Sequence, residues 1–207
     1  EMQKQQIKSD DCLHELINFQ YGYIAWCLGE KRNKEAEQYL KIAESNLKIL
    51  ENRNYSKSII SSYNAAFLGF RIGLNSVRAP LLGPRSVDAA KLAITQDPKN
   101  PYGYIQYANA QYYMPSIFGG SKQEAIEYYQ KAEKIMNSDV NLRRNNWNYL
   151  SLLTTIANAY VDTGNLWLAK TYYERILVLE PEFNWVKNEL YPELLKKLKL
   201  WKTIRKY

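Results

Sequence analysis

The chain has 207 residues, of which 46% are hydrophobic and 24% charged, and its formal net charge is +7. This balance argues against an intrinsically disordered protein, and no apolar run approaches the roughly 18 residues that a membrane-spanning helix needs. Two cysteines are too few for a disulfide framework or a four-cysteine zinc site. At this length, we expect a single helical domain over residues 1–207 that folds around an apolar core.

The first predicted pair of helices covers residues 10–53. Ser9, Asp10 and Asp11 are candidates for the N-cap of a helix that runs to about residue 30, near Gly29. Small and apolar residues recur there at helical spacing, and again in a partner helix that passes Ala36 and ends near residue 51. Of the four predicted pairs, this one follows the shared residue pattern least closely.

The second predicted pair covers residues 56–98. A helix over 56–75 presents Ala65 and Ile72 at the same spacing, and its partner over 86–96 carries small residues and ends before Pro98. Between them, residues 77–85 contain two prolines and a glycine. Because proline lacks the backbone donor that a helix uses, the sequence predicts that this segment is not helical.

The third predicted pair covers residues 101–137. Its first helix is rich in tyrosine and is followed by a loop at 114–120 that contains Gly119 and Gly120. Ser121 and Glu124 stand three residues apart, which predicts a capping box at the start of the partner helix. Ala125 then faces the first helix.

The fourth predicted pair covers residues 142–181 and has the most regular pattern. Ala157 and Ala169 allow two helices to approach closely, Gly164 permits a left-handed turn between them, and Pro181 ends the second helix. After it, residues 182–205 predict a capping helix that is broken near Pro192 and covers the last open face.

The residues of the fourth pair follow the spacing W-x2-L-G-x2-Y in the first helix, then A-x3-F in the second, then P at its end. The chain therefore resembles a tetratricopeptide repeat protein. The resemblance implies an all-α fold: a right-handed α-α superhelix of about four hairpins with a C-terminal capping helix. Pro115, Phe118, Gly119, Gly120 and Lys122 also resemble the lengthened P-x-x-F-G-G-x-K turn of a group of bacterial tetratricopeptide proteins, which implies an often exported scaffold without known chemistry. The chain opens on Glu1 rather than methionine, so we expect removal of a leader and a periplasmic or exported location, with the cytoplasm as the alternative.

The inner groove is the first candidate binding surface. Asn109 and Asn158 occupy equivalent places in the third and fourth pairs, and Tyr113 and Asp162 lie one turn further on. In some members of the family, such asparagines bind the backbone of a peptide ligand. The leading hypothesis is therefore a protein or peptide partner, whose identity the sequence leaves open.

The turns of the second and third pairs form the second candidate surface. We count from the last groove-facing residue of the first helix to the small residue that opens the partner helix. This interval is 14 positions in both pairs (72 to 86 and 111 to 125), against 9 in the fourth pair (160 to 169). Exposed anchors on these expanded turns would be Arg78, Arg85, Phe118 and Lys122. The alternative is that Leu81, Leu82, Ile117 and Phe118 only pack the turns against the scaffold.

Two further binding classes remain. A small molecule or ion could occupy a pocket between the expanded turns and the tyrosine-rich helix from Tyr102 to Tyr113. The C-terminal segment carries six cations and no acid, which suits nucleic acid or an anionic membrane, or simply the solvated face of a capping helix. These cations are Lys196, Lys197, Lys199, Lys202, Arg205 and Lys206. We expect the capping role and no nucleic-acid binding, and the oligomeric state stays open.

Catalysis has little support in the sequence. His14 is the only histidine, which excludes a multi-histidine metal site, and Gly119-Gly120-Ser121-Lys122 lacks the spacing of a phosphate-binding loop. Cys12 and Cys27 would lie about 22 Å apart along one helix, too far to pair, and are expected to be buried thiols. We therefore expect no catalytic residues, no metal and no cofactor, and a protein that is not an enzyme.

Overall fold

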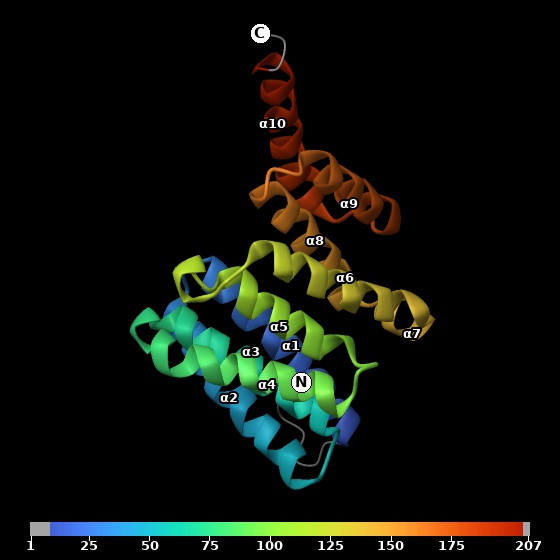
Figure 1. Cartoon of the computed structure of the whole chain (residues 1–207). Coiled ribbons are helices and arrows are strands. Elements are labelled where there is room, and N and C mark those ends of the chain that lie inside the picture. The colour runs from blue at the N-terminus through green and yellow to red at the C-terminus, as the bar shows by residue number, and fades with distance from the viewer. Residues whose placement is uncertain (1–8, 205–207) are drawn as a thin grey trace. The chain divides into compact units, whose positions relative to one another are not determined.

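The computed structural model describes residues 9–204, the last three by their backbone alone. All regular structure in this range is helical, and consecutive helices pack in pairs, which confirms the predicted all-α fold (Figure 1). The chain divides into two compact units, Glu1–Ala110 and Gln111–Tyr207, and each is described by itself below.

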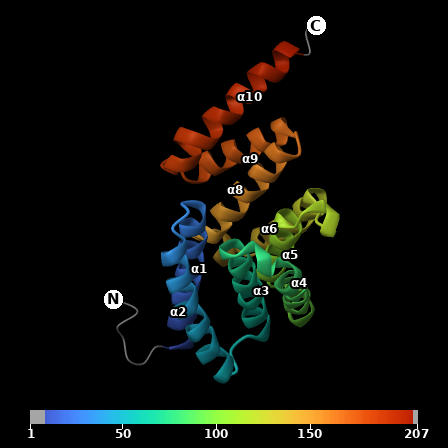
Figure 2. The ribbon, with the colours of Figure 1, turned by 90° about the vertical axis from the view of Figure 1, so that its left-hand side faces the viewer.

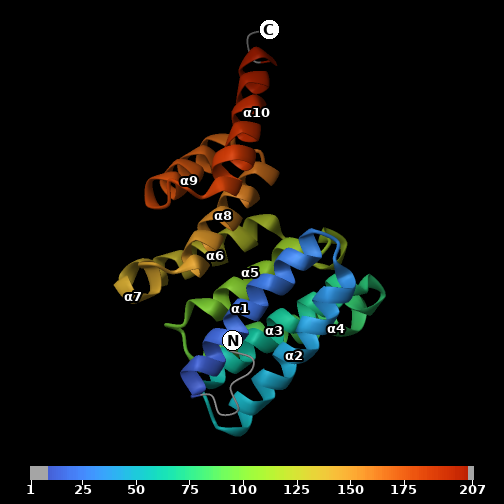
Figure 3. The same ribbon diagram turned by 180° about the vertical axis from the view of Figure 1, so that it is seen from behind.

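The first unit consists of two complete helical hairpins and most of a further helix. Its elements are α1 (Asp10–Gly29), α2 (Asn33–Asn52), α3 (Lys57–Leu74), the 3-10 turn η2 (Ser76–Arg78), α4 (Ala79–Gln96) and α5 (Pro101–Tyr113), whose last three residues belong to the second unit. Helix α2 runs along α1, and α4 runs along α3 (Figure 2 and Figure 3). The predicted N-cap is confirmed, since Ser9 Oγ accepts a hydrogen bond from the amide of Cys12 at 3.2 Å.

Small residues lie where these helices cross. Ala36 and Ala90 are fully buried. Ser86 stands where the other hairpins have alanine, and its hydroxyl donates to the carbonyl of Ala65 at 2.8 Å. The serine therefore keeps the close approach of α4 and α3 that alanine would give, with its polar group satisfied inside the protein.

The segment 77–85 corrects the sequence prediction. Helix α4 begins at Ala79 and contains Pro80, Gly83 and Pro84, so most of this segment is helical. Pro80 lies in the first turn, where backbone amides have no partner within the helix, and its fixed backbone angle suits that position. Only Pro84 interrupts the hydrogen-bond ladder. The expansion of the second hairpin is therefore a longer helix, whereas residues 114–121 of the third form a loop around the 3-10 turn η3 (Ser116–Phe118).

The inner side of the first unit is filled by its own side chains. Tyr21 on α1 packs against Tyr63 and Phe70 on α3, with ring centroids 6.1 and 5.3 Å away. The phenol of Tyr21 also accepts a hydrogen bond from Gln106 Nε2 on α5 at 3.3 Å. The first helices of successive hairpins thus contact one another here through their side chains.

The second unit begins at the end of α5. Its elements are η3, α6 (Lys122–Ser138), the short helix α7 (Val140–Arg143), α8 (Trp147–Asp162), α9 (Leu166–Leu179), the π-helical turn η4 (Val186–Leu190) and α10 (Tyr191–Ile204). Ser121 caps α6 by accepting from the Glu124 amide at 3.1 Å, as the sequence predicts. Ala157 and Ala169 are fully buried between α8 and α9, and Gly164 has the expected left-handed backbone, with φ of +78°.

Helix α10 covers the end of the last hairpin. Leu194 and Leu198 are buried, whereas Lys196, Lys197 and Lys199 point to solvent on the same helix. The expected break near Pro192 is not found, because the π-helical turn η4 passes directly into α10 at Tyr191, so the helix changes its type there without ending. Of the predicted basic tail, the side chains of Lys202, Arg205 and Lys206 lie outside the described residues. Lys196 and Lys199 fit the solvated face of a capping helix, whereas Lys197 borders a pocket that is described below.

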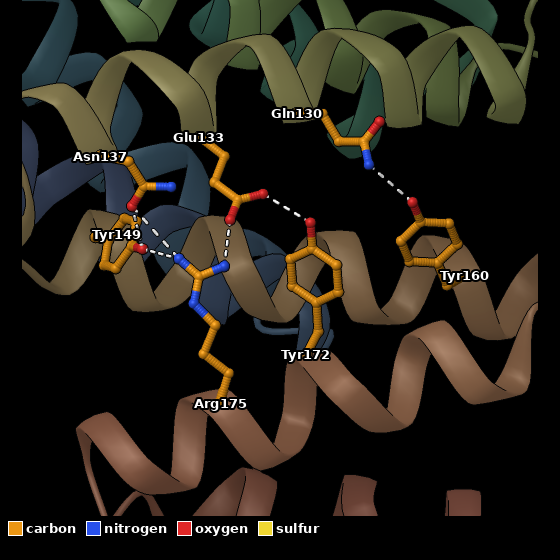
Figure 4. A network of polar contacts seen from close by, with 7 residues as sticks. All are labelled: Gln130, Glu133, Asn137, Tyr149, Tyr160, Tyr172 and Arg175. Carbon is orange, nitrogen blue, oxygen red and sulfur yellow. Dashed lines mark hydrogen bonds and ion pairs between the residues drawn. The ribbon is translucent and has the colours of Figure 1, made fainter.

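A polar network joins α6, α8 and α9 (Figure 4). Glu133 on α6 forms an ion pair with Arg175 on α9 and accepts a hydrogen bond from Tyr172 at 2.7 Å. Arg175 also donates to the phenol of Tyr149 on α8. Because Glu133 is buried, this network fixes how α6 packs against the hairpin of α8 and α9.

Candidate ligand pocket

A pocket of about 270 Å³ opens in the second unit. Seven of its nine lining residues come from α8 and from the η4–α10 segment, and the other two are tyrosines on α5 and α9. The lining consists of Tyr112, Asn158, Val161, Asp162, Tyr173, Leu190, Glu193, Leu194 and Lys197. The pocket therefore joins the end of α5, the last hairpin and the capping helix, with both aromatic walls and charged groups.

Asn158 and Tyr173 form one side of the pocket. The phenol of Tyr173 on α9 donates a hydrogen bond to Oδ1 of Asn158 on α8. Burial, helped by the negative charges of Glu193 and Asp162, raises the pKa of Tyr173 to about 12, so the phenol stays a donor at neutral pH. Nδ2 of Asn158 has no partner among the described residues and is available to a ligand.

Asp162 lies one helical turn beyond Asn158 on α8 and holds the neighbouring part of the pocket together. Its Oδ2 accepts hydrogen bonds from the Tyr112 phenol and, at 2.9 Å, from Lys122 Nζ. The Lys122 ammonium also lies 5.2 Å from the centroid of the Tyr112 ring. Burial would raise the pKa of Asp162, but these two hydrogen bonds and the charges of Lys122 and Lys197 outweigh it and lower the pKa. Asp162 is therefore ionised and largely neutralised by Lys122.

The capping helix supplies two opposite charges. Leu190, Glu193, Leu194 and Lys197 follow the spacing i, i+3, i+4 and i+7, which places them on one face of η4 and α10. Glu193 and Lys197 form no hydrogen bond or ion pair with any other described residue, and they do not pair with each other. Both charges nonetheless act on the pocket, because Glu193 raises the pKa of Tyr173 and Lys197 lowers that of Asp162.

The structure brings three of the predicted site residues together: Asn158, Asp162 and Lys122. Sequence reasoning missed Tyr112 and assigned the place to its neighbour Tyr113, which is 76% exposed and packs its ring edge-on against Tyr112. Helical register could have pointed to Tyr112, because it lies four residues after the fully buried Ala108 and so on the same face of α5.

Asn109 belongs to a different environment. It lies in the first unit, where its Nδ2 donates to Gln106 Oε1 at 3.1 Å. Burial raises the pKa of the neighbouring Tyr21, against hydrogen bonds with Gln106 and Asn109 that lower it. Asn109 is thus part of the hydrogen-bonded filling between α1 and α5.

The expanded turns expose more apolar surface than a purely structural role requires. Ile117 and Phe118 are 84% and 71% exposed, and Leu81 is 68% exposed, so the packing alternative is wrong for these three and holds only for Leu82. Arg78 and Arg85 in the first unit are exposed, and no ion pair to either is found within residues 9–204.

The remaining candidates for chemistry have structural partners. His14 Nδ1 lies 3.2 Å from the hydroxyl of Tyr55, and burial lowers the pKa of this histidine. Cys12 and Cys27 are both free thiols, the second buried and the first half-buried. In the part of the chain that the structure describes, no cluster of histidine, cysteine and acidic residues could hold a metal, and no helix is long and apolar enough to cross a membrane.

No protein-family model matches the sequence, and no curated protein matches it. Among solved structures, the HusA haemophore from Porphyromonas gingivalis is similar, with a TM-score of 0.63 over 78% of this chain and 80% of that chain. The sequences are 19% identical, and at that level the likeness shows a shared helical fold only.

Proposed function

We propose that this chain is a non-catalytic binding protein of tetratricopeptide-like architecture and that the pocket of its second unit holds a small ligand. One observation carries the proposal: Glu193, Lys197 and the Nδ2 atom of Asn158 line the same pocket, beside two tyrosines, and have no partner among the residues that the structure describes. Binding sites are typically mostly apolar concavities with a few convergent polar groups, and they range from roughly 300 Å³ upward. At about 270 Å³, the pocket lies just below the lower end of that range.

The similar solved structure lends support to the class of ligand but not to its identity. A haemophore, by its title, carries a small molecule. Haem itself does not fit this pocket, because its iron is held by histidine, cysteine, methionine or tyrosinate. Tyr112 and Tyr173 are the only such residues in the lining, and both phenols are already engaged as hydrogen-bond donors, to Asp162 and to Asn158.

A thermal-shift screen of small metabolites tests the proposal. A ligand at 100 times its dissociation constant adds about 2.7 kcal/mol to the free energy of unfolding. We expect the stabilisation by any hit to be lost in Lys197→Glu and kept in Lys196→Glu, which changes the neighbouring charge on the solvent side. A screen without hits, or hits that ignore Lys197, would remove the pocket as the binding site.

A protein partner is the second candidate, favoured by one observation. Tyr113, Ile117 and Phe118 expose 76%, 84% and 71% of their surface on one short turn. Aromatic residues of this kind anchor protein interfaces. A photo-crosslinking residue placed at 118 should form one discrete adduct in cells, and one placed at Gln123 on the adjacent helix should not. Diffuse labelling at both positions would argue against this surface.

A further inference from the structure

The charges around the pocket specify more than its size. Asp162 is paired with Lys122, so these two charges largely cancel. Glu193 and Lys197 remain, one negative and one positive, both exposed and both without partners within residues 9–204. The pocket therefore has a net charge near zero but offers two separate, opposite charges.

The two charges are separated by one helical turn. Residues four apart on a helix differ by about 6 Å along its axis. A glutamate four residues before a lysine commonly pairs with it across that turn. Here the two side chains do not pair with each other, and each influences a different pocket residue: Glu193 acts on Tyr173, and Lys197 acts on Asp162. Each is available to one end of a bound molecule.

We propose that the ligand is a small zwitterion, a molecule with one cationic and one anionic group a few bonds apart, of which free amino acids are the simplest class. This inference rests on the proposed function. Lys197 and the Nδ2 donor of Asn158 would bind the anionic group, and Glu193 would bind the cationic group. The Tyr112 and Tyr173 rings, with Leu190 and Leu194, would contact the apolar body of the ligand.

Other charge types fit the pocket less well. A dianion such as phosphate would meet the carboxylates of Asp162 and Glu193, and a simple cation would meet Lys122 and Lys197. A neutral apolar ligand would cover both unpaired charges without replacing their water, which is unfavourable. A zwitterion satisfies both ends at once.

Calorimetric titration of the full chain with three forms of one amino acid tests this directly. The free amino acid is a zwitterion, its carboxyl amide is a cation, and its N-acetyl derivative is an anion. Glycine, leucine and phenylalanine, each in all three forms, sample the space for the side chain. We expect the free form of at least one to bind about tenfold or more tightly than either derivative, because each derivative leaves one protein charge unpaired.

Two variants assign the ends of the ligand. Glu193→Gln should weaken the free and amide forms and leave the N-acetyl form unchanged. Lys197→Gln should weaken the free and N-acetyl forms and leave the amide unchanged. Lys196→Gln is the matched control and should change none of them. All three substitutions are at exposed positions, so folding is expected to be unaffected.

The possible results separate this inference from the proposed function. Equal binding of the three forms, or no binding of any at millimolar concentration, would contradict the inference that the ligand is a zwitterion. If a metabolite of another charge type then stabilises the protein in a manner that depends on Lys197, the pocket is a small-molecule site and only the ligand class is wrong. If no small molecule binds, the proposed function fails as well.

Discussion

Tyr173 and Asn158 meet across the last hairpin, where the phenol on α9 donates a hydrogen bond to the side-chain carbonyl on α8. Because the phenol is a donor at neutral pH, it fixes the orientation of the amide and leaves Nδ2 facing outward. Tyr173 is also 2% exposed and fills the space between the two helices. One residue therefore serves both the packing of the hairpin and the polarity of the pocket.

Replacing Tyr173 by phenylalanine should separate these two roles. The ring stays, so we expect a loss of only about 1 kcal/mol in the free energy of unfolding, the usual contribution of one hydrogen bond. Urea denaturation measures it. Tyr39→Phe is the control, since the Tyr39 phenol forms no hydrogen bond within the described chain and should cost almost nothing. Equal stability of both variants and the parent would show that the phenol of Tyr173 does not hold Asn158.

Alkaline pH should weaken the second unit through the same phenol. The pKa of Tyr173 is raised from 10.0 to about 12, which means that the folded state favours the neutral form. The contribution of this group to stability is therefore complete below pH 10 and is lost as the pH rises toward 12. Unfolding followed by circular dichroism across this range should show that Tyr173→Phe loses less stability than the parent. An identical loss in both would contradict the raised pKa.

The fold was predictable because its signals are local. Ser121, Gly164 and the alanines at the helix crossings act through their immediate backbone and one neighbouring helix, and each has the predicted role. Residues 77–85 were misassigned for a related reason. Counting prolines ignores their position, and Pro80 in the first turn of α4 is compatible with a helix.

The pocket was only partly predictable because it depends on tertiary placement. Asn158 and Asp162 follow from the spacing of the hairpins, but the sequence does not say which residues of the capping helix face them. Glu193 and Lys197 looked like ordinary surface charges, and Lys197 was grouped with the basic tail. Likewise, nothing in the residue pattern indicates that Gln106 would donate a hydrogen bond to Tyr21 within the first unit.

The Glu133–Arg175 pair should be the most sensitive polar contact of the second unit (Figure 4). Only 9% of the Glu133 side chain is exposed, against 37% for Arg175. Glu133→Gln leaves the guanidinium without its counter-ion, and we expect a loss of about 2 kcal/mol, below the 3–5 of fully buried pairs because Arg175 is partly solvated. Glu127→Gln, at an exposed position six residues earlier on α6, should stay within about 0.5 kcal/mol of the parent in urea denaturation.

Replacing Gly164 or Gly69 by alanine should change the free energy of unfolding in opposite directions. Gly164 has a φ of +78°, and an alanine there would be strained by about 1 kcal/mol or more, although no atom lies within 4 Å of the added carbon. Gly69 lies within α3 with open space around it and no such backbone angle, so Gly69→Ala should stabilise by about 0.5–1 kcal/mol. Thermal and urea unfolding of both variants measure the difference. If Gly164→Ala also stabilises the protein, the turn between α8 and α9 does not need the left-handed conformation, and the break between these helices has another cause.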